Sequence, residues 1–159
     1  MPAAPLHWPA PALQAPLLAA LAHGHACWPE EACGVIFGGS TLAYLPGENA
    51  AQRRQRAFTL SPALLIAEAR RGRRPVAFAH SHPRGDAEMS ATDHAGATLG
   101  AEPAWPGVDH IITAVSPTGP AHLTVHRWHH GRRRYQPVWT FTPDAHGALQ
   151  GRLRSADPK

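Results

Sequence analysis

Two short segments of the sequence hold side chains that can bind a metal ion, HSHP at residues 80–83 and SATD at residues 90–93. If the apolar run before them is a buried strand, His80 and His82 project from the same face, about 6 to 7 Å apart at the backbone. Asp93 would lie in the first turn of the next helix, from which its carboxylate can return toward the strand end. Two imidazoles and one carboxylate suit zinc and leave a fourth tetrahedral position for water, as in a catalytic rather than a structural site.

Hydrolysis at such a site needs two further groups. Zinc lowers the pKa of bound water to about 7, but a side chain must take the proton and deliver it to the leaving amine. Glu31, which lies where a helix is expected to give way to a strand, is the candidate for this proton shuttle. A hydroxyl donor near the metal would stabilise the oxyanion, and Ser90 suits that role.

These residues resemble the JAMM signature of the Mov34/MPN-type metalloproteins. In that signature a Glu precedes H-[ST]-H-P, seven residues separate the second His from a Ser, and an Asp follows three residues after the Ser. The segment EACG at residues 31–34, together with HSHP and SATD, fills all five positions. The resemblance extends over about residues 13–115 in the order of the expected elements.

The resemblance implies a cytidine-deaminase-like α/β fold, a single catalytic zinc, and a role for each residue of the signature. His80, His82 and Asp93 would hold the metal, Glu31 would act as general acid and base, and Ser90 would donate to the oxyanion. Small bacterial members resemble peptidases that cleave after the C-terminal Gly-Gly of ubiquitin-like proteins, including sulfur carriers, and larger relatives remove ubiquitin from lysine. We therefore expect a zinc metallopeptidase with deubiquitinase-like isopeptidase or C-terminal processing activity. The carrier, the type of bond and the oligomeric state stay open.

The order of the expected elements predicts an α/β domain with a mixed sheet flanked by helices. Helices are expected over residues 13–26, with a buried stripe of leucines at 13, 17, 18 and 21, over 61–72, with Ser61 as cap, and over 90–99. Strands are expected over residues 33–37, 41–45, 75–80 and 109–115, with a hairpin formed by 123–128 and 135–141. We assign residues 1–142 to one domain, with a Pro-rich leader over about residues 1–11, and expect the polar residues 143–159 to form a loose tail.

Composition narrows the class of protein further. With 159 residues, 43% of them hydrophobic and 16% charged, the chain can bury one core, so disorder of the whole chain is not expected. Two cysteines form neither a disulfide framework nor a four-cysteine zinc site, which favours reduced thiols in the cytoplasm. The apolar stretch 13–21 is shorter than the roughly 20 residues that span a bilayer, and no basic segment precedes it. We expect a soluble, untargeted protein.

Structural interpretations compete with the functional ones at several positions. Ser90 and Asp93 have the spacing of a helix capping box, and a capping residue can also face a metal. Cys33 could approach the site, but we interpret it as a small buried filler. The ten histidines outside HSHP lack an acidic ligand at fixed spacing, so we expect them on the surface or in turns. Trp105 could line a substrate groove, although a turn at residues 105–107 is favoured.

Two other classes of function stay open. A non-catalytic MPN module could use the same fold as an interaction surface, but such relatives characteristically lack some ligands. Nucleic-acid association would use three arginine clusters, at residues 53/54/56, 70/71/73/74 and 132/133/134. Because Lys159 is the only lysine, the arginines are consistent with genomic base composition and a solvated surface. Absence of the H-x-E and P-C-x-x-C pattern excludes a base deaminase.

Overall fold

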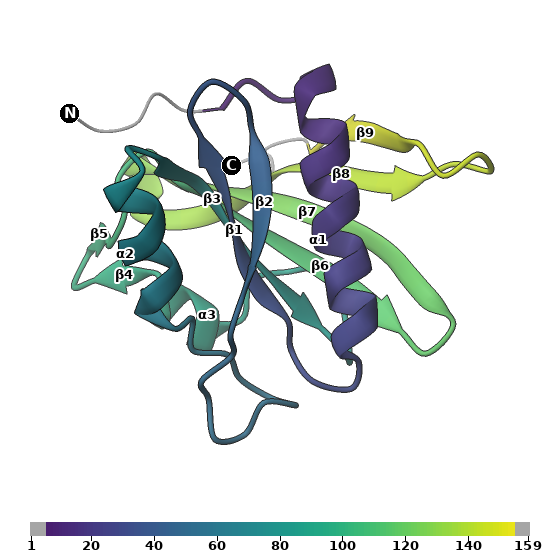
Figure 1. The fold of residues 1–159 in the computed structure, drawn as a ribbon, viewed down its shortest axis with the longest axis horizontal. Coiled ribbons are helices and arrows are strands. Elements are labelled where there is room, and N and C mark those ends of the chain that lie inside the picture. Colours follow the sequence, from purple (N-terminus) through teal and green to yellow (C-terminus); the bar gives the residue numbers. More distant parts are fainter. Residues whose placement is uncertain (1–5, 155–159) are drawn as a thin grey trace.

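The computed structural model describes residues 6–154, without the side chains of residues 119–121. Within this part of the chain, seven strands form one sheet in the order β2-β1-β3-β6-β7-β8-β9 (Figure 1). Their bounds are β1 Cys33–Gly38, β2 Ala43–Gly47, β3 Arg74–His82, β6 Asp109–Ser116, β7 Gly119–His129, β8 Arg134–Pro143 and β9 Leu149–Leu153. The β3 and β6 strands are parallel and the other neighbours antiparallel, so the predicted mixed sheet is confirmed.

Helices flank this sheet, as predicted. The α1 helix spans Gln14–Cys27 after a 3-10 turn at Pro11–Leu13, α2 spans Pro62–Arg70 and α3 spans Ala91–Gly96. Figure 1 shows α1 crossing the sheet at a distance from α2 and α3. Contacts join α1 to β2, β3, β6 and β7, whereas α2 contacts β3.

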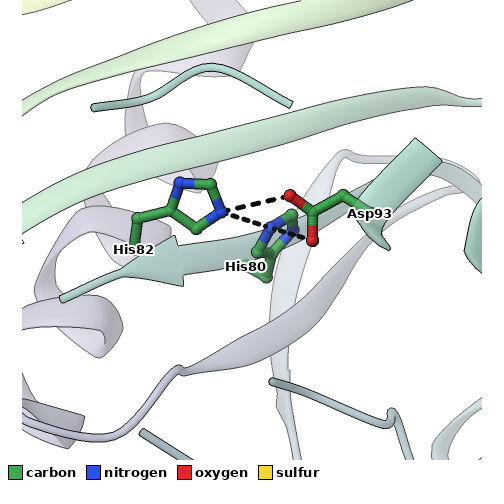
Figure 2. A group of neighbouring side chains, drawn as sticks. All are labelled: His80, His82 and Asp93. Carbon is green, nitrogen blue, oxygen red and sulfur yellow. Dashed lines mark hydrogen bonds and ion pairs between the residues drawn. The ribbon is translucent and has the colours of Figure 1, made fainter. Parts of the chain in front are cut away.

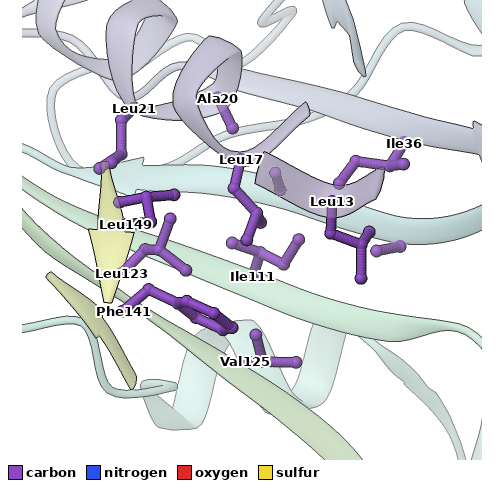
Figure 3. Close-up of a cluster of buried hydrophobic side chains, with 12 residues drawn as sticks. Leu13, Leu17, Ala20, Leu21, Ile36, Ile111, Leu123, Val125, Phe141 and Leu149 are labelled. Atoms are coloured by element: carbon purple, nitrogen blue, oxygen red, sulfur yellow. The ribbon is translucent and has the colours of Figure 1, made fainter. Parts of the chain in front are cut away.

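The hydrophobic core lies between α1 and the sheet (Figure 3). Leu13, Leu17 and Leu21 form the buried stripe at helical spacing, each at most 2% exposed, but the expectation that Leu18 belongs to it is wrong, since Leu18 is 37% exposed. They pack over Ile111 and Phe141 of the sheet. Full burial of one such side chain stabilises the fold by roughly 1.5 to 3 kcal/mol, so this stripe fixes α1 on its face of the sheet.

The β3 strand separates this core from the opposite face of the sheet. Ala77 and Ala79 belong to the core cluster under α1. Because successive side chains alternate between faces, His80 and His82 point away from α1. The strand extends through His82, which pairs with Ala114 of β6, so it runs two residues past its predicted end at His80.

The third helix is shorter than the sequence predicts. It ends at Gly96 instead of continuing to residue 99, and Thr98–Leu99 then pairs with Glu102–Pro103 as a small hairpin, β4-β5. Gly100 turns the chain there with φ of 62°, a left-handed conformation that glycine adopts without strain. At the start of α2, Ser61 stands at the N-cap position, but its side chain makes no capping hydrogen bond.

The expectation of a loose tail is wrong for residues 144–154. The Asp144 carboxylate accepts hydrogen bonds from the backbone N–H groups of His146 and Ala148, which closes a turn. Leu149 is buried, and the Gln14 side chain bonds to both its carbonyl and its N–H. These contacts with α1 hold β9 against β8.

The predictions for the two ends of the chain are tested only in part. Residues 1–5 of the Pro-rich leader and residues 155–159 lie outside the described residues. A domain boundary after residue 142 stays a prediction. None of the helices within residues 6–154 has the length and apolar character that a membrane crossing requires.

Two adjacent leucines of α1 provide a test of this packing. Leu17 is 1% exposed and Leu18 is 37% exposed. We expect Leu17→Ala to lower the free energy of unfolding by about 2 to 5 kcal/mol, because it leaves a cavity under α1. Leu18→Ala, the matched control, should lower it by less than about 1 kcal/mol. Urea unfolding of both variants measures the difference, and equal losses would contradict the packing described.

Candidate metal centre

Three side chains meet at the end of β3 (Figure 2). The Nε2 atoms of His80 and His82 are 3.1 Å apart. Asp93 Oδ1 lies 3.3 Å from His80 Nε2, and Asp93 Oδ2 lies 3.2 Å from His82 Nε2. The sequence-predicted ligands are therefore brought together as a group that could hold a metal ion.

The spacing of these atoms fits zinc. Ligands at about 2.0 to 2.1 Å from a zinc ion stand about 3.3 Å apart at the corners of a tetrahedron. The 3.1 Å between the two Nε2 atoms is close to that edge length, and each Nε2 atom lies 3.2 or 3.3 Å from one of the two Asp93 carboxylate oxygens. Two imidazole nitrogens and one carboxylate would occupy three corners and leave the fourth for water or substrate.

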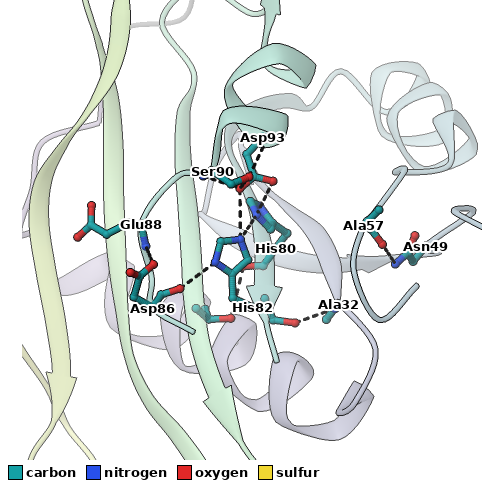
Figure 4. Close-up of polar contacts among 11 residues, drawn as sticks. Ala32, Asn49, Ala57, His80, His82, Asp86, Glu88, Ser90 and Asp93 are labelled. Carbon is teal, nitrogen blue, oxygen red and sulfur yellow. Dashed lines mark hydrogen bonds and ion pairs between the residues drawn. The ribbon is translucent and has the colours of Figure 1, made fainter. Parts of the chain in front are cut away.

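Neighbouring groups orient the two imidazole rings. His82 Nδ1 lies 2.8 Å from the Asp86 carbonyl oxygen (Figure 4). A hydrogen bond donated there places the proton on Nδ1 and turns the Nε2 lone pair toward the other ligands. Phe58 stacks on His80 with ring centroids 4.3 Å apart and planes 23° apart. Both rings therefore face the proposed metal position before any ion binds.

Ser90 and Asp93 form the capping box that their spacing predicts. The Asp93 N–H donates to Ser90 Oγ at 3.1 Å, and the Ser90 N–H donates to Asp93 Oδ2 at 2.9 Å. The Ser90 hydroxyl also donates to Asp93 Oδ2, at 2.6 Å. Burial raises the pKa of Asp93, but hydrogen bonds from His80, His82 and Ser90 outweigh burial and hold it well below its usual range. The carboxylate is thus ionised, as a metal ligand must be.

Glu31 lines the same cleft as the three candidate ligands and is 8% exposed. Burial raises the pKa of Glu31 to about 7, although the charge of His82 lowers it in part and the charge of Asp93 adds to the rise. A carboxyl group with a pKa near 7 can both accept and donate a proton at neutral pH.

The backbone at Glu31 and Ala32 is held by hydrogen bonds to two other segments, β3 and the loop that carries Arg54. The Ala32 N–H donates to the buried Ser81 hydroxyl at 2.8 Å, and the Ser81 N–H donates to the Ala32 carbonyl at 2.9 Å. Because Ser81 lies between His80 and His82, these bonds join the Glu31 segment to the strand that carries the candidate ligands. On the other side, the Glu31 N–H donates to the Arg54 carbonyl at 2.7 Å.

Asn49 is a positioning residue that the sequence reasoning missed. Its side-chain N–H groups donate to the carbonyl of Glu31, at 2.9 Å, and to that of Ala57, at 3.1 Å. Figure 4 shows the bond to Ala57. Its oxygen accepts from the N–H groups of Ala51 and Thr59. One side chain thus joins Glu31 to the loop that carries Phe58. An asparagine within a turn is too common a feature for sequence alone to identify this role.

A cleft of about 1060 Å³ opens over the candidate ligands. Its apolar walls include Phe58, Leu65, Phe78 and Trp105. Trp105 is 42% exposed and packs against Phe78 with ring centroids 5.4 Å apart. The expected turn at residues 105–107 is present, with the Val108 N–H bonded to the Trp105 carbonyl, but Trp105 also lines the cleft.

The expectation that the other histidines lie on the surface or in turns is wrong for His110 and His126. They face each other in β6 and β7 and are 8% and 1% exposed. Alternation along both strands brings them onto the face of the sheet that carries the candidate ligands. Burial lowers the pKa of His110 to about 3, and the charges of His80 and His126 add to the effect. Cys33, expected as a filler, is buried, and burial raises the pKa of its thiol to about 11.

Paired imidazoles, a capping aspartate and a buried glutamate in one cleft are the parts of a hydrolytic metal centre. The family described as prokaryotic homologs of the JAB domain matches residues 14–134, and this chain belongs to that family. A desampylase of Haloferax volcanii is 36% identical over 108 residues, which cover 63% of this chain and 70% of the relative.

Solved structures agree on the fold. A protein from Salinibacter ruber is similar with a TM-score of 0.56 and 25% identity, covering 88% of this chain and 96% of that one. A protein from Desulfitobacterium hafniense is similar with a TM-score of 0.51 and 21% identity, covering 87% and 86% of the two chains. At 21% identity, the similarity to the Desulfitobacterium hafniense protein shows a shared fold only.

Removal of the Asn49 side chain should loosen the loop that it holds. We expect Asn49→Ala to lower the free energy of unfolding by about 1 to 3 kcal/mol, because buried hydrogen-bonding groups lose their partners. It should also accelerate tryptic cleavage after Arg53, Arg54 and Arg56, which the loop carries. Limited trypsinolysis followed by mass spectrometry measures the rates. Gln52→Ala, at an exposed position of the same loop, is the control and should leave the rates unchanged.

Because His110 is buried, we expect the free energy of unfolding to depend on pH. Its pKa is about 3 in the folded protein and about 6.5 when unfolded, so the unfolded state binds more protons between these values. Stability is therefore lost as the pH falls below about 6.5. Between pH 7 and pH 4.5, we expect the free energy of unfolding of His110→Phe to rise by about 2 to 3 kcal/mol relative to that of the parent protein. Urea unfolding at each pH measures this difference. A difference independent of pH would contradict the neutral, buried imidazole.

Proposed function

We propose that this protein is a zinc-dependent metallopeptidase that hydrolyses a peptide or isopeptide bond after the C-terminal Gly-Gly of a ubiquitin-like or sulfur-carrier protein. The observation that carries the proposal is the meeting of two imidazole Nε2 atoms, 3.1 Å apart, with the Asp93 carboxylate, whose two oxygens lie 3.2 and 3.3 Å from them, in the cleft that also contains the Glu31 carboxyl group. This is a complete set of groups for hydrolysis. An intact set argues against a purely non-catalytic scaffold.

His80, His82 and Asp93 would hold the metal in this proposal. Zinc bound there would supply a Lewis acid for the substrate carbonyl and lower the pKa of water. Asp93 is kept in place by the capping box with Ser90. The Nε2 atom of His82 is kept available by the bond between Nδ1 and the Asp86 carbonyl.

Glu31 is the proton shuttle. It takes a proton from the attacking water while the new carbon–oxygen bond forms at the carbonyl, and it delivers that proton to the amine nitrogen as the carbon–nitrogen bond breaks. Its pKa of about 7 suits both directions of transfer. The hydroxyl of Ser90 would turn from Asp93 toward the oxyanion and donate to it.

Two features support a ubiquitin-like substrate. The relative from Haloferax volcanii is named a desampylase, which implies a ubiquitin-like protein as the substrate of that enzyme. The cleft walls beside the ligands are aromatic, with Phe58 over His80 and Trp105 against Phe78. Glycine has no side chain, so a Gly-Gly tail can pass close to such walls. We also place the protein in the cytoplasm, where the unpaired thiols of Cys27 and Cys33 would stay reduced.

The proposal is tested by cleavage. Zinc-loaded protein is incubated with ubiquitin-like sulfur carriers that are extended or conjugated beyond Gly-Gly, with and without a chelator, and the products are weighed by mass spectrometry. We expect release after Gly-Gly that the chelator abolishes and added zinc restores. Cleavage that persists after complete zinc removal would contradict the metallopeptidase, and a failure to cut any carrier would contradict the substrate class.

Two substitutions separate metal binding from proton transfer. We expect Glu31→Gln to keep one zinc per chain but lower kcat by about 10² to 10⁴, because the amide cannot accept the proton. His82→Ala should lose both zinc and turnover. Metal analysis and kcat are measured for each, with Glu48→Gln at an exposed position as the control, expected within about twofold of the parent. Full turnover by Glu31→Gln would refute the shuttle.

A further inference from the structure

The structure distinguishes the three arginine clusters by their partners. In the second cluster, Arg71 and Arg73 both bind the buried Glu68 carboxylate. In the third, Arg133 pairs with Glu102 at 3.0 Å. These arginines are already partly neutralised by the protein itself.

The ion pair of the first cluster is longer than those of the other two clusters. Arg54 and Glu30 approach each other only to 4.0 Å, with both side chains 48% exposed. Within residues 6–154, Arg53 and Arg56 make no ion pair and are exposed. Exposed pairs of this kind contribute little, so the cluster is in effect a set of free surface charges.

The loop that carries this cluster is hydrogen-bonded to the backbone of Glu31, the candidate catalytic residue. The loop turns with a hydrogen bond from the Arg56 N–H to the Arg53 carbonyl, and the Arg54 carbonyl accepts from the Glu31 N–H. Arg56 lines the cleft above the ligands, and residues 50–56 with Glu30 line an adjoining polar hollow of about 810 Å³. The loop is therefore held at the edge of the site by the same bonds that position Glu31.

Arg84 adds a fourth cation to this edge. It follows β3 directly, is exposed and lines the cleft. The acidic groups nearby are mostly engaged, since Glu88 binds Arg154 and Asp93 binds the histidines. Asp86 and Glu30 are the exposed exceptions, since one Asp86 oxygen accepts from the Glu88 N–H and Glu30 approaches Arg54 only to 4.0 Å. Unpaired positive charge thus exceeds unpaired negative charge around the cleft mouth.

We propose that Arg53, Arg54, Arg56 and Arg84, here termed the arginine rim, form a docking surface for an acidic face on the folded body of the substrate protein. The inference rests on the proposed function, because it assumes that the tail of that protein enters the cleft. A rim beside the cleft attracts the acidic body over roughly a Debye length of about 8 Å at physiological salt, and it orients the tail toward Glu31. Electrostatic complementarity of this kind acts mainly on the association rate and on the choice of partner.

The arrangement favours a protein over nucleic acid as the partner. Nucleic-acid binding gains affinity from many phosphate contacts. The second and third clusters contribute arginines that already bind Glu68 and Glu102. The rim, by contrast, is local to the cleft mouth and matches a single acidic patch beside a tail.

Binding is measured with the Glu31→Gln protein, loaded with zinc, so that cleavage does not consume the probe. The probe is a ubiquitin-like sulfur carrier extended beyond Gly-Gly, with acidic residues around its tail, and a second version carries Asn and Gln in place of those acids. We expect the acidic version to bind at least about tenfold more tightly at 50 mM salt, and the advantage to shrink at 500 mM.

Charge reversal then locates the contact. Arg53→Glu/Arg56→Glu should weaken binding of the acidic carrier by about tenfold or more at 50 mM salt. Arg132→Glu/Arg134→Glu makes the same change in net charge, in the turn between β7 and β8 and at the first residue of β8, and should alter affinity by less than about threefold. Equal losses in the two variants would overturn the proposal in favour of a general charge effect. Circular dichroism and zinc content verify that each variant is folded.

Two further results would overturn the proposal in different ways. Tight, salt-sensitive binding of a short DNA duplex that depends on Arg53 and Arg56, without binding of the acidic carrier, would assign the rim to nucleic acid. Equal affinity for the acidic and neutral carriers would show that the rim does not dock the body. Because these assays measure binding and not turnover, they stand apart from the cleavage test, and a protein that docks the carrier but cuts nothing would refute the proposed function alone.

Discussion

The alternation of side chains along β3 is the constraint on which the core and the site both depend. Ala77 and Ala79 pack under α1, while His80 and His82 face the cleft. A shift of one residue in pairing would move the histidines into the core and the alanines into the cleft. The register with β1 on one side and β6 on the other prevents this shift. Burial of the leucine stripe of α1 therefore also sets the direction of the candidate metal ligands.

Ser81 shows how closely the two faces are connected. It lies between the two histidines, and its hydroxyl and N–H bond to the backbone of Ala32, next to Glu31. These bonds thus fix the position of the candidate proton shuttle relative to the strand that carries the ligands. Asn49 and the Arg54 carbonyl complete this support from the loop side. A proton shuttle needs such support, because small displacements from the productive geometry can lower the rate considerably.

The surroundings of the two carboxyl groups of the site shift their pKa values in opposite directions. Burial raises the pKa of Glu31 to about 7, so that it can exchange a proton near neutral pH. Hydrogen bonds from two imidazoles and from Ser90 overcome the burial of Asp93 and keep its pKa low. Two acids in one cleft are therefore suited to different tasks, one to proton transfer and one to metal binding. The arginines also differ in their partners, since Arg73 lies 3.0 Å from Glu68 and Arg133 lies 3.0 Å from Glu102, whereas Arg54 of the rim approaches Glu30 only to 4.0 Å.

The sequence by itself determined what depends on short spacing. The alternation of His80 and His82, the capping box of Ser90 and Asp93, and the leucine stripe of α1 each follow from local backbone geometry, which residue types and offsets specify. The signature also pointed to Glu31, although the sequence contains no physical contact between it and the histidines. Only the tertiary structure decided the rest: the bonds of Asn49, the burial of His110 and His126, the pairing of β9 and the placing of one arginine cluster beside the cleft. These features depend on which distant segments become neighbours, and that is decided by strand pairing and packing over the whole sheet rather than by any local pattern.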